Sequence, residues 1–286
     1  MKQNKIAVVV DSSANLSEQE IQKYHIKVVN QPVMFGKHVY RENIDLNADE
    51  FYRMMKLEKT HPTNSQISMK QMQIVFKNLA IQGYEAVLCV GLSGGLSGFI
   101  NSVSASIPTI KDLTVYTFDS GSILSGTGHM AMLASQLLAD GVNIHEVLEQ
   151  LRKYRSKTQV YIALNNVREL QNSATFLTRT SLVNSFFGMR PIVTINKKGR
   201  LEMIGKERQM KNAMEEIQDI FQANVSEVDQ YVVTVIYAND VDRSEKWQSE
   251  LELTYPQLRV ESCQIGPYIG AFTGRHAIGL IWSPKL

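Results

Sequence analysis

The sequence predicts a protein of the α/β class with two domains. Its 286 residues are long for a single core, and 44% of them are hydrophobic, so the chain can bury substantial apolar area. In the first half, short apolar runs alternate with helical segments, which is typical of a parallel sheet with helices on both faces. We expect an N-terminal parallel-sheet α/β domain over 1–158 and a C-terminal α+β domain with a mixed, partly antiparallel sheet over 159–286.

The elements of the first domain follow from apolar runs and helix caps. Ser17 and Glu20 have capping-box spacing, and Asn47, Ser68 and Asn143 precede further helical segments as N-caps. Apolar or β-branched runs bounded by glycine or polar turns predict strands. The predicted strands cover 6–10, 26–34, 38–40, 86–90 and 113–118. The predicted helices cover 17–24, 48–55, 69–82, 99–107, 125–139 and 144–154.

The second domain mixes a hairpin with helices. The turn Asn196-Lys197-Lys198-Gly199 joins two apolar runs and predicts a β-hairpin. The predicted strands cover 160–164, 191–195, 201–204, 231–237, 258–263 and 277–282. The predicted helices begin at 166–170 and cover 178–187, 209–223 and 242–253. The glycine-rich segment 265–276 is expected to be irregular backbone that approaches a ligand or a domain seam.

The segment 91–98 reads GLSGGLSG and directly follows the apolar run 86–90. Loops at the carboxyl ends of parallel strands bind ligands in open α/β sheets. Four glycines allow close backbone approach, and the hydroxyls of Ser93 and Ser97 can hydrogen-bond. The loop contains no Lys, Asp, His or Cys, so it is suited to holding an oxygen-rich group rather than to moving protons. A simple glycine-rich turn explains its composition equally well.

Composition argues against several classes of partner. The formal net charge of +2 with scattered Lys and Arg does not indicate nucleic acid or an anionic membrane. Cys89 and Cys263 lie in or beside apolar runs as expected free thiols, and no metal-ligand spacing or cofactor motif occurs. No segment approaches membrane-spanning length, and the apolar run near the N-terminus is too short for a signal peptide. We therefore expect a cytoplasmic protein with no metal and no cofactor.

A serine hydrolase is one alternative. Gly91-Leu92-Ser93-Gly94-Gly95 matches the G-x-S-x-G elbow after a strand, and Asp119 and His276 follow in the order of a triad. Against this, the LSG sequence repeats four residues later instead of leading at once into a helix, and no oxyanion segment precedes it.

Apolar side chains favour a different function. The second domain carries a surplus of large side chains that includes Phe176, Phe186, Phe187 and Ile192. An ordinary core is the usual explanation, but such a set could also line a long apolar tunnel. An acyl chain of a dozen methylenes, at about 0.8 kcal/mol each, would supply ample affinity, and the hydroxyl loops would then hold its polar end.

Taken together, these segments resemble the DegV family of bacterial fatty-acid-binding proteins. The resemblance spans nearly the whole chain in order, and each single motif in it is short. The matching motifs are Asp11-Ser12-Ser13, the loop 63–68, Leu92-Ser93 with Leu96-Ser97-Gly98, Asp119-Ser120, Arg190-Pro191-Ile192, and Ile265-Gly266-Pro267 with Gly270-Ala271 and Thr273-Gly274. The chain departs from the family pattern at Asn64, Gly94 and Phe272, where the family carries a hydroxyl residue, a serine and a histidine.

The resemblance implies a lipid carrier that is not an enzyme by itself. One long-chain fatty acid, such as hexadecanoate, would lie in a tunnel with its carboxylate at the domain seam, and a separate ATP-binding fatty acid kinase subunit would phosphorylate it. The implied head-group residues are Asn64, Ser65, Ser93, Gly94, Gly95, Thr273 and His276. The implied tunnel residues are Phe176, Phe186, Phe187, Ile192 and Phe272, and Arg208 would face the kinase. A divergent carrier of another apolar ligand is a further alternative.

Overall fold

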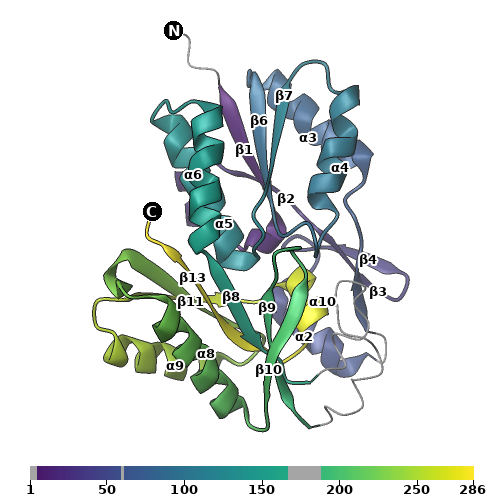
Figure 1. Ribbon diagram of the computed structural model, residues 1–286. Coiled ribbons are helices and arrows are strands. Elements are labelled where there is room, and N and C mark those ends of the chain that lie inside the picture. The colour runs from purple at the N-terminus through teal and green to yellow at the C-terminus, as the bar shows by residue number, and fades with distance from the viewer. Residues whose placement is uncertain (1–4, 59–60, 167–187) are drawn as a thin grey trace.

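The computed structural model describes residues 5–58, 61–166 and 188–286, and its upper half is a parallel sheet (Figure 1). The order of this four-stranded sheet is β2-β1-β6-β7, and each neighbouring pair is parallel. The strands are β1 (Ile6–Asp11), β2 (Lys27–Val29), β6 (Ala86–Gly91) and β7 (Thr114–Asp119). Parallel order places the loops that leave β1, β6 and β7 together at one edge.

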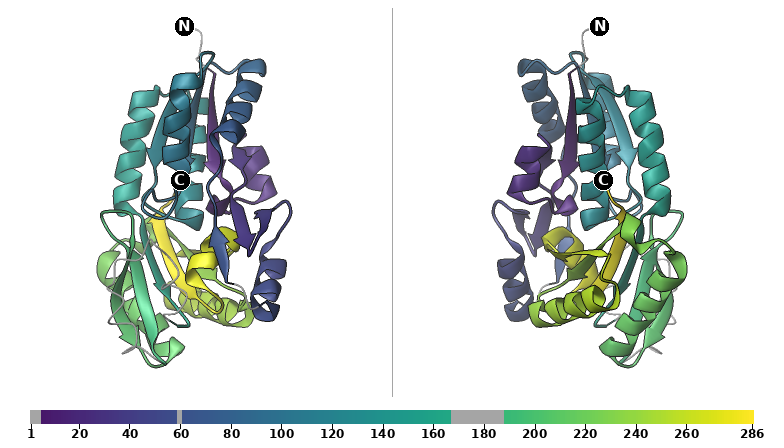
Figure 2. Two further views of the ribbon diagram at one scale, coloured as in Figure 1. Left: turned by 90° about the vertical axis from the view of Figure 1, so that its right-hand side faces the viewer. Right: turned by 90° about the vertical axis from the view of Figure 1, so that its left-hand side faces the viewer.

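Helices cover both faces of this sheet, as Figure 2 shows. Side chains alternate along β1: Val8 and Val10 pack on one face with α5 (Leu124–Ala139) and α6 (Ile144–Lys157). Ala7 and Val9 pack on the other face with α3 (Met69–Ile81) and α4 (Phe99–Ser106). The short helix α1 (Glu18–Lys23) follows β1, and the predicted capping box of Ser17 and Glu20 is present. Burial on both faces explains why these strands read as continuous apolar runs.

The lower half is a mixed six-stranded sheet with the order β10-β9-β8-β13-β11-β12. Its pairs are antiparallel except for β11 with β12. The strands are β8 (Gln159–Ala163), β9 (Arg190–Ile195), β10 (Leu201–Glu207), β11 (Tyr231–Tyr237), β12 (Arg259–Gln264) and β13 (Ile278–Pro284). Helices α8 (Met210–Asn224) and α9 (Val241–Thr254) cover one face. The predicted α/β class, with a parallel sheet and a mixed, partly antiparallel sheet, is confirmed.

A third, antiparallel sheet was not predicted as a separate sheet, although the turn at Gly36 into a partner strand at 38–40 was predicted and is present. It has the order β4-β3-β5, with β3 (Pro32–Phe35), β4 (His38–Arg41) and β5 (Pro62–Asn64), and α2 (Ala48–Leu57) follows β4. The prediction of a single strand over 26–34 is therefore wrong. Strand β2 pairs with β1, and the chain then leaves the parallel sheet before β3 begins. Pro32 at the start of β3 lacks the N–H that a continuous ladder would need.

One apolar cluster joins the six-stranded sheet, the three-stranded sheet and the loops that leave the parallel sheet. It combines Phe51 of α2, Leu92 after β6 and Ile162 of β8, among others, and all three side chains are fully buried. The boundary between 158 and 159 stays a prediction, and this core extends across it. Short 3-10 helices complete the described elements: η1 (Ser12–Ala14), η2 (Ile107–Thr109) and η4 (Val228–Gln230). None of the helices in the described ranges is long and apolar enough to cross a bilayer.

The segment 265–276 is not irregular, contrary to prediction, because it contains helix α10 (Pro267–Thr273). Pro267 stands at N1, where the missing N–H costs nothing. A Cβ atom at Gly270 would lie 2.6 Å from Cε1 of Phe51, so glycine here allows close helix packing rather than a loop. The other predicted strands and helices in the described ranges are present within a few residues, whereas the predicted helix 178–187 and most of 166–170 lie outside those ranges.

Candidate ligand-binding site

The loops that leave β1, β6 and β7 face the six-stranded sheet, and we call them the seam loops: residues 11–15, 91–98 and 119–122. The buried carboxylate of Asp11 fixes their backbone, because it accepts hydrogen bonds from the N–H groups of Ser13 (3.1 Å) and Leu92 (3.0 Å). Burial raises the pKa of Asp11 above its usual range, and the bonds from Ser13 and Leu92 oppose that rise. Asp11 thus holds the backbone of two seam loops in place.

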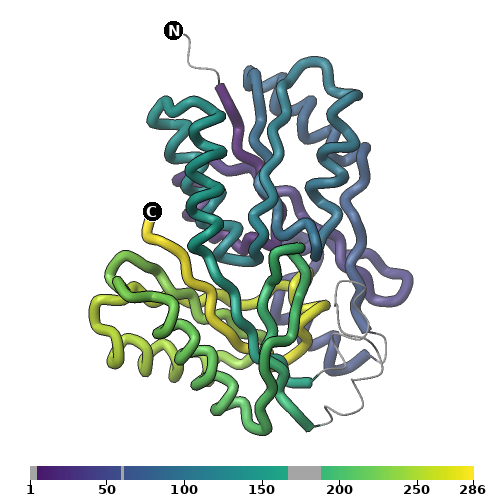
Figure 3. Tube along the Cα trace, viewed as in Figure 1, coloured from purple at the N-terminus to yellow at the C-terminus, as the bar shows by residue number. Residues whose placement is uncertain are grey.

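Ser93 lies at the contact between the seam loops and the lower sheet. Its side chain is buried, and its hydroxyl donates to the carbonyl of Gly199 at 2.7 Å. Gly199 belongs to the turn 196–199 between β9 and β10, which rises from the lower sheet to the upper half of the molecule (Figure 3). The predicted hydroxyl loop therefore has a buried donor whose present acceptor is a backbone carbonyl of this turn.

Neighbouring groups pack so closely around Gly94 and Gly95 that neither position has space for a side chain. The Gly94 N–H donates to the carboxylate of Asp119 at 3.1 Å, and a Cβ atom on Gly94 would lie 2.7 Å from the same group. A Cβ atom on Gly95 would lie 2.4 Å from the carbonyl oxygen of Gly199. The turn 196–199 thus packs directly against the glycine backbone, with no room for a side chain.

Asn64 and Ser65 come from β5 and the residue after it. The side-chain amide of Asn64 donates to the carbonyl of Tyr268 at 2.9 Å, while its buried Oδ1 atom has no hydrogen-bond partner among the residues that the structure describes. The Ser65 N–H donates to the carbonyl of Pro32 at 3.1 Å. An unpaired buried amide oxygen is uncommon in proteins, and as an acceptor it can pair only with a group that donates a hydrogen bond.

The three residues expected from the C-terminal motif lie in different surroundings. Thr273 is buried, and its hydroxyl donates to the carbonyl of Ile269 within α10. Phe272 is buried and packs edge-on against Tyr268, with ring centroids 5.8 Å apart. His276 turns elsewhere: its Nδ1 atom is 3.6 Å from Oδ2 of Asp240, at the start of α9.

His276 and Ser93 lie at opposite ends of the lower sheet. His276 lies two residues before Ile278 of β13. Ile278 pairs with Ala163 of β8, and Ala163 pairs with Ile192 near the start of β9. The turn 196–199, which carries the partner of Ser93, leaves the sheet at the other end. The triad order Ser93, Asp119, His276 is therefore not assembled in this structure. The backbone φ angle of Ser93 is not positive, so Ser93 does not have the left-handed backbone strain that a nucleophile elbow can contain.

The residues predicted to line the tunnel do not form one group in the structure. Phe176, Phe186 and Phe187 lie outside the described residues. Ile192 is buried against Ile217 and its neighbours on α8, on one face of the six-stranded sheet. Phe272 belongs to the apolar cluster on the opposite face of the sheet. Val193, which directly follows Ile192 in the sequence, also belongs to that cluster. Strand alternation alone thus separates Ile192 from Phe272.

A buried acidic network beside the seam loops was missed by the sequence reasoning. Glu42 is 1% exposed and accepts hydrogen bonds from the hydroxyl of Ser12 (2.5 Å) and the N–H of Tyr268 (2.9 Å). The hydroxyl of Tyr268 donates to Ser97 at 3.1 Å, which links the network to the glycine loop. Burial raises the pKa of Glu42 to about 7, and the nearby charge of Asp11 adds to the rise. Nothing near Glu42 in sequence signals this, because its partners are remote.

Arg208 lies in the connection between β10 and α8 and is exposed. Its exposed position allows contact with a second protein, and within the described part of the chain it forms no hydrogen bond to the buried groups above. Its role as a partner-facing residue stays a prediction.

Comparison with known proteins gives one consistent result. The family model described as "Uncharacterised protein, DegV family" matches residues 5–285. A DegV domain-containing protein of Listeria monocytogenes is 31% identical over 281 residues, which cover 98% of this chain and 99% of the relative. Protein DegV of Bacillus subtilis is 27% identical over 98% of this chain and 99% of its own length.

Solved structures agree with the fold. The crystal structure described as DegV, a fatty acid binding protein from Bacillus subtilis, has a TM-score of 0.89 and 26% identity, covering 98% of this chain and 99% of that one. A DegV family protein from Thermus thermophilus, described by its fatty acid binding, has a TM-score of 0.89 and 23% identity, covering 98% of this chain and 100% of that one. At 23% identity, the second likeness supports the fold alone.

Proposed function

The chain belongs to the DegV family, and from this premise we propose that it binds one long-chain fatty acid and performs no chemistry on it alone. The Bacillus subtilis structure, described as a fatty acid binding protein, supports the ligand class, because 26% identity extends over 98% of this chain. The observation in this chain that carries the proposal is the buried hydroxyl of Ser93 at the edge of a continuous apolar cluster.

In the proposed complex, the carboxylate replaces the Gly199 carbonyl as the acceptor of the Ser93 hydroxyl. The turn 196–199 moves aside to admit it. In Asn64, only the amide N–H groups can support the same head group, because the unpaired Oδ1 atom is an acceptor and cannot hydrogen-bond a carboxylate. A hydrogen bond to a charged acceptor contributes about 1.5–3 kcal/mol, roughly a 10- to 100-fold effect on affinity. Ser65, Gly94 and Gly95 complete the proposed head-group set, because they adjoin these two residues in the chain.

The acyl chain lies against the face of the six-stranded sheet that α8 and α9 do not cover, where Phe272, Val193 and Ile162 contribute to the apolar cluster. A dozen methylenes at about 0.8 kcal/mol each give an upper bound near 10 kcal/mol for their burial. Much of this is offset by the loss of ligand freedom on binding. The chain supplies most of the affinity and the head group sets the orientation.

The protein would present the bound acid to an ATP-binding kinase subunit that makes the acyl phosphate, with Arg208 on the docking surface. The resemblance of Arg208 to a family position and its exposure support this step. We place the protein in the cytoplasm, where its free thiols Cys89 and Cys263 would stay reduced. An assay of ATP consumption with the kinase subunit and loaded carrier tests the step. Arg208→Ala should lower the rate, and an equal rate would remove Arg208 from the docking surface.

Binding is tested by titrating the purified, delipidated chain with a fluorescent long-chain fatty acid. We expect saturation at one ligand per chain and an affinity at least tenfold lower for Ser93→Ala. Ser104→Ala on α4, where the side chain is exposed, is the matched control and should bind as the unmodified chain does. Equal affinity of all three proteins would refute the head-group assignment, and absence of saturation would refute the ligand class.

The hydrolase alternative receives a direct test in the same preparation. Because the Ser93 hydroxyl donates to a carbonyl and His276 pairs with Asp240, we expect no covalent labelling by a fluorophosphonate probe. Labelling that disappears in Ser93→Ala would establish the hydrolase instead.

A further inference from the structure

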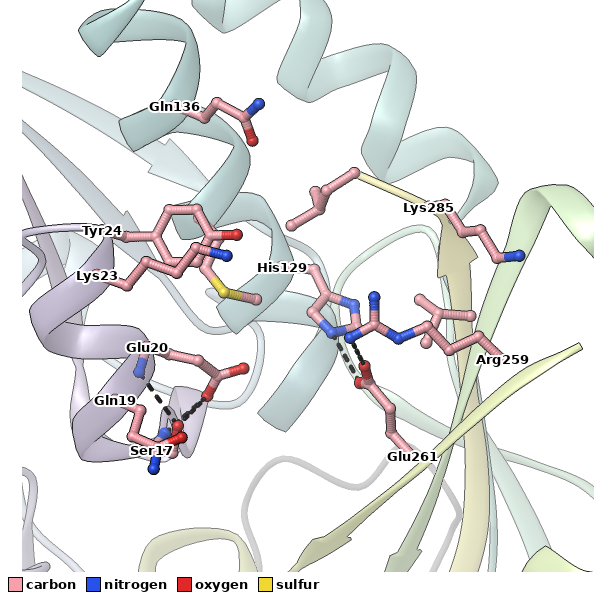
Figure 4. Close-up of a pocket in the computed structure, with 13 residues that line it drawn as sticks. Ser17, Gln19, Glu20, Lys23, Tyr24, His129, Gln136, Arg259, Glu261 and Lys285 are labelled. Carbon is pink, nitrogen blue, oxygen red and sulfur yellow. Dashed lines mark hydrogen bonds and ion pairs between the residues drawn. The ribbon is translucent and has the colours of Figure 1, made fainter.

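The polar cavity between α1, α5 and β12, of about 520 Å³, mixes charges of both signs (Figure 4). Basic and acidic side chains line it together: Lys23, Arg259 and Lys285 with Glu20 and Glu261. Arg259 lies 2.7 Å from a carboxylate oxygen of Glu261 within this wall. Because opposite charges lie side by side, the cavity favours neither an anion nor a cation.

An unmatched hydrogen-bond acceptor lies instead at the proposed fatty acid site, on Asn64. Asn64 ends β5 and pairs with Val33 of β3, and directly paired residues of an antiparallel ladder point to the same face. Val33 is fully buried in the apolar cluster against which the acyl chain is proposed to lie. The side chain of Asn64 therefore points to the face of the small sheet that packs on this cluster.

The partner of the Asn64 amide fixes its orientation. A backbone carbonyl can only accept a hydrogen bond, so the atom 2.9 Å from the Tyr268 carbonyl is the amide nitrogen of Asn64. The Oδ1 atom is then left without a hydrogen-bond partner among the described residues, although it is buried. Leaving a buried acceptor unpaired costs free energy, so a ligand group that donates to it gains affinity.

A chain of contacts connects Asn64 to Ser93. Tyr268 accepts from Asn64 through its carbonyl and donates to Ser97 through its hydroxyl, at 3.1 Å. The Ser97 N–H in turn donates to the carbonyl of Ser93 at 3.1 Å. An acyl ligand whose polar end is held by Ser93 thus has Asn64 among its surroundings.

The acidic acceptor of the same network is already engaged. Both carboxylate oxygens of Glu42 accept hydrogen bonds, one from the hydroxyl of Ser12 and the other from the N–H of Tyr268. Among these described groups, the open position is therefore the Oδ1 atom of Asn64.

A plain carboxylate cannot fill this position, because it has no hydrogen to donate. A hydroxyl group on a carbon next to the carboxylate can donate to Oδ1, and so can the N–H of an amide. In either case an oxygen of the same head group still accepts from the Ser93 hydroxyl.

We infer that the preferred ligand is a long-chain acyl compound whose polar end carries a hydrogen-bond donor, either a hydroxy fatty acid or a fatty amide. Its O–H or N–H binds Oδ1 of Asn64, and its carboxyl or amide oxygen binds Ser93. This inference rests on the proposed function, because it takes from it both the site and the acyl chain.

Competition against a fluorescent long-chain fatty acid tests the inference on the delipidated full chain at pH 8. The competitors are hexadecanoate, 2-hydroxyhexadecanoate, 3-hydroxyhexadecanoate and hexadecanamide. We expect at least one of the three donor-bearing ligands to bind about tenfold more tightly than hexadecanoate, the effect of one hydrogen bond to an otherwise unpaired buried acceptor. The ligand that shows this advantage identifies the donor as a hydroxyl group or an amide.

Two variants assign the advantage to Asn64. Asn64→Leu removes the acceptor at similar volume, so the ratio of the two affinities should fall to about one, whatever the variant does to both affinities together. Ser93→Ala is the matched control, because it removes the other head-group contact. It should weaken both ligands and keep the ratio. The comparison on the unmodified chain needs no variant, so it holds even if Asn64→Leu does not fold.

Two results would overturn the inference and leave fatty acid binding intact. One is equal affinity for hexadecanoate and all three donor-bearing ligands. The other is an advantage that persists unchanged in Asn64→Leu. If none of the four ligands displaces the probe and the probe itself does not bind, the proposed function fails, and the inference fails with it.

Discussion

Replacing Glu42 by glutamine should change the pH dependence of stability. Glu42 is buried among Ser12, Tyr268 and Asp11, and Tyr52 also lies close enough to interact with its charge. Glutamine has the same shape: its oxygen can accept from the Tyr268 N–H, and its amide can donate to Ser12. The variant therefore mimics the protonated carboxyl at every pH.

The magnitude follows from the pKa of Glu42, about 7 in the folded chain against an ordinary value of 4.5. Because the folded state holds this proton more tightly than the unfolded state, ionisation costs folding free energy as pH rises through the window from 4.5 to 7. Between pH 5 and pH 8, linkage gives a loss of about 2.5 kcal/mol for Glu42 that the glutamine variant does not have. The stability that Glu42 contributes is fully present below pH 4.5 and is lost above pH 7.

Urea unfolding of both proteins from pH 5 to pH 8 measures this loss. We expect the free energies of unfolding to be similar at pH 5 and the Glu42→Gln variant to become more stable by a few kcal/mol at pH 8. Glu252→Gln, an exposed glutamate on α9, is the control and should follow the unmodified chain. Parallel curves for Glu42→Gln and the unmodified chain over the whole range would refute the reasoning.

Three further predictions concern packing and burial. Gly95→Ala should destabilise the chain by about 1–3 kcal/mol in urea unfolding, because its methyl group would lie 2.4 Å from the Gly199 carbonyl oxygen; an unchanged midpoint would contradict this packing. Tyr52→Phe should cost about 1–3 kcal/mol, since it leaves the buried Ile265 carbonyl without the 2.9 Å bond from the tyrosine hydroxyl; a neutral result would show that water replaces it. Burial raises the pKa of the Cys89 thiol, so folded Cys263→Ser protein should not react with a thiol-reactive disulfide reagent at pH 8 until urea unfolds it, and rapid reaction would place Cys89 at the surface.

Local signals account for what the sequence predicted well. The capping box of Ser17 and Glu20 and the N-caps Asn47 and Ser68 act within three residues, so their helices begin where the sequence indicates. The run 86–90 is apolar because both of its faces are covered, and it forms β6. Such features depend on nearest neighbours along the chain.

What the sequence could not predict depends on distant partners. Glu42 is held by Ser12, 30 residues away, and by Tyr268, 226 residues away, so no local pattern distinguishes it from a surface glutamate. The acceptor of the Ser93 hydroxyl lies 106 residues away in the turn 196–199. Ile192 and Val193 are both apolar, and only the register of β9 decides which of them faces Phe272. The glycines and proline of 265–276 indicate a loop locally, and tertiary packing against Phe51 makes part of it a helix.

Native mass spectrometry of the purified full chain tests the central claim, fatty acid binding, most directly. Organic extraction and lipid analysis of the same sample identify whatever is bound. The account predicts an added mass of one long-chain fatty acid per chain, reduced in Ser93→Ala and retained in Ser104→Ala. A chain that carries no lipid, and that takes up none when incubated with long-chain fatty acids, would contradict the account.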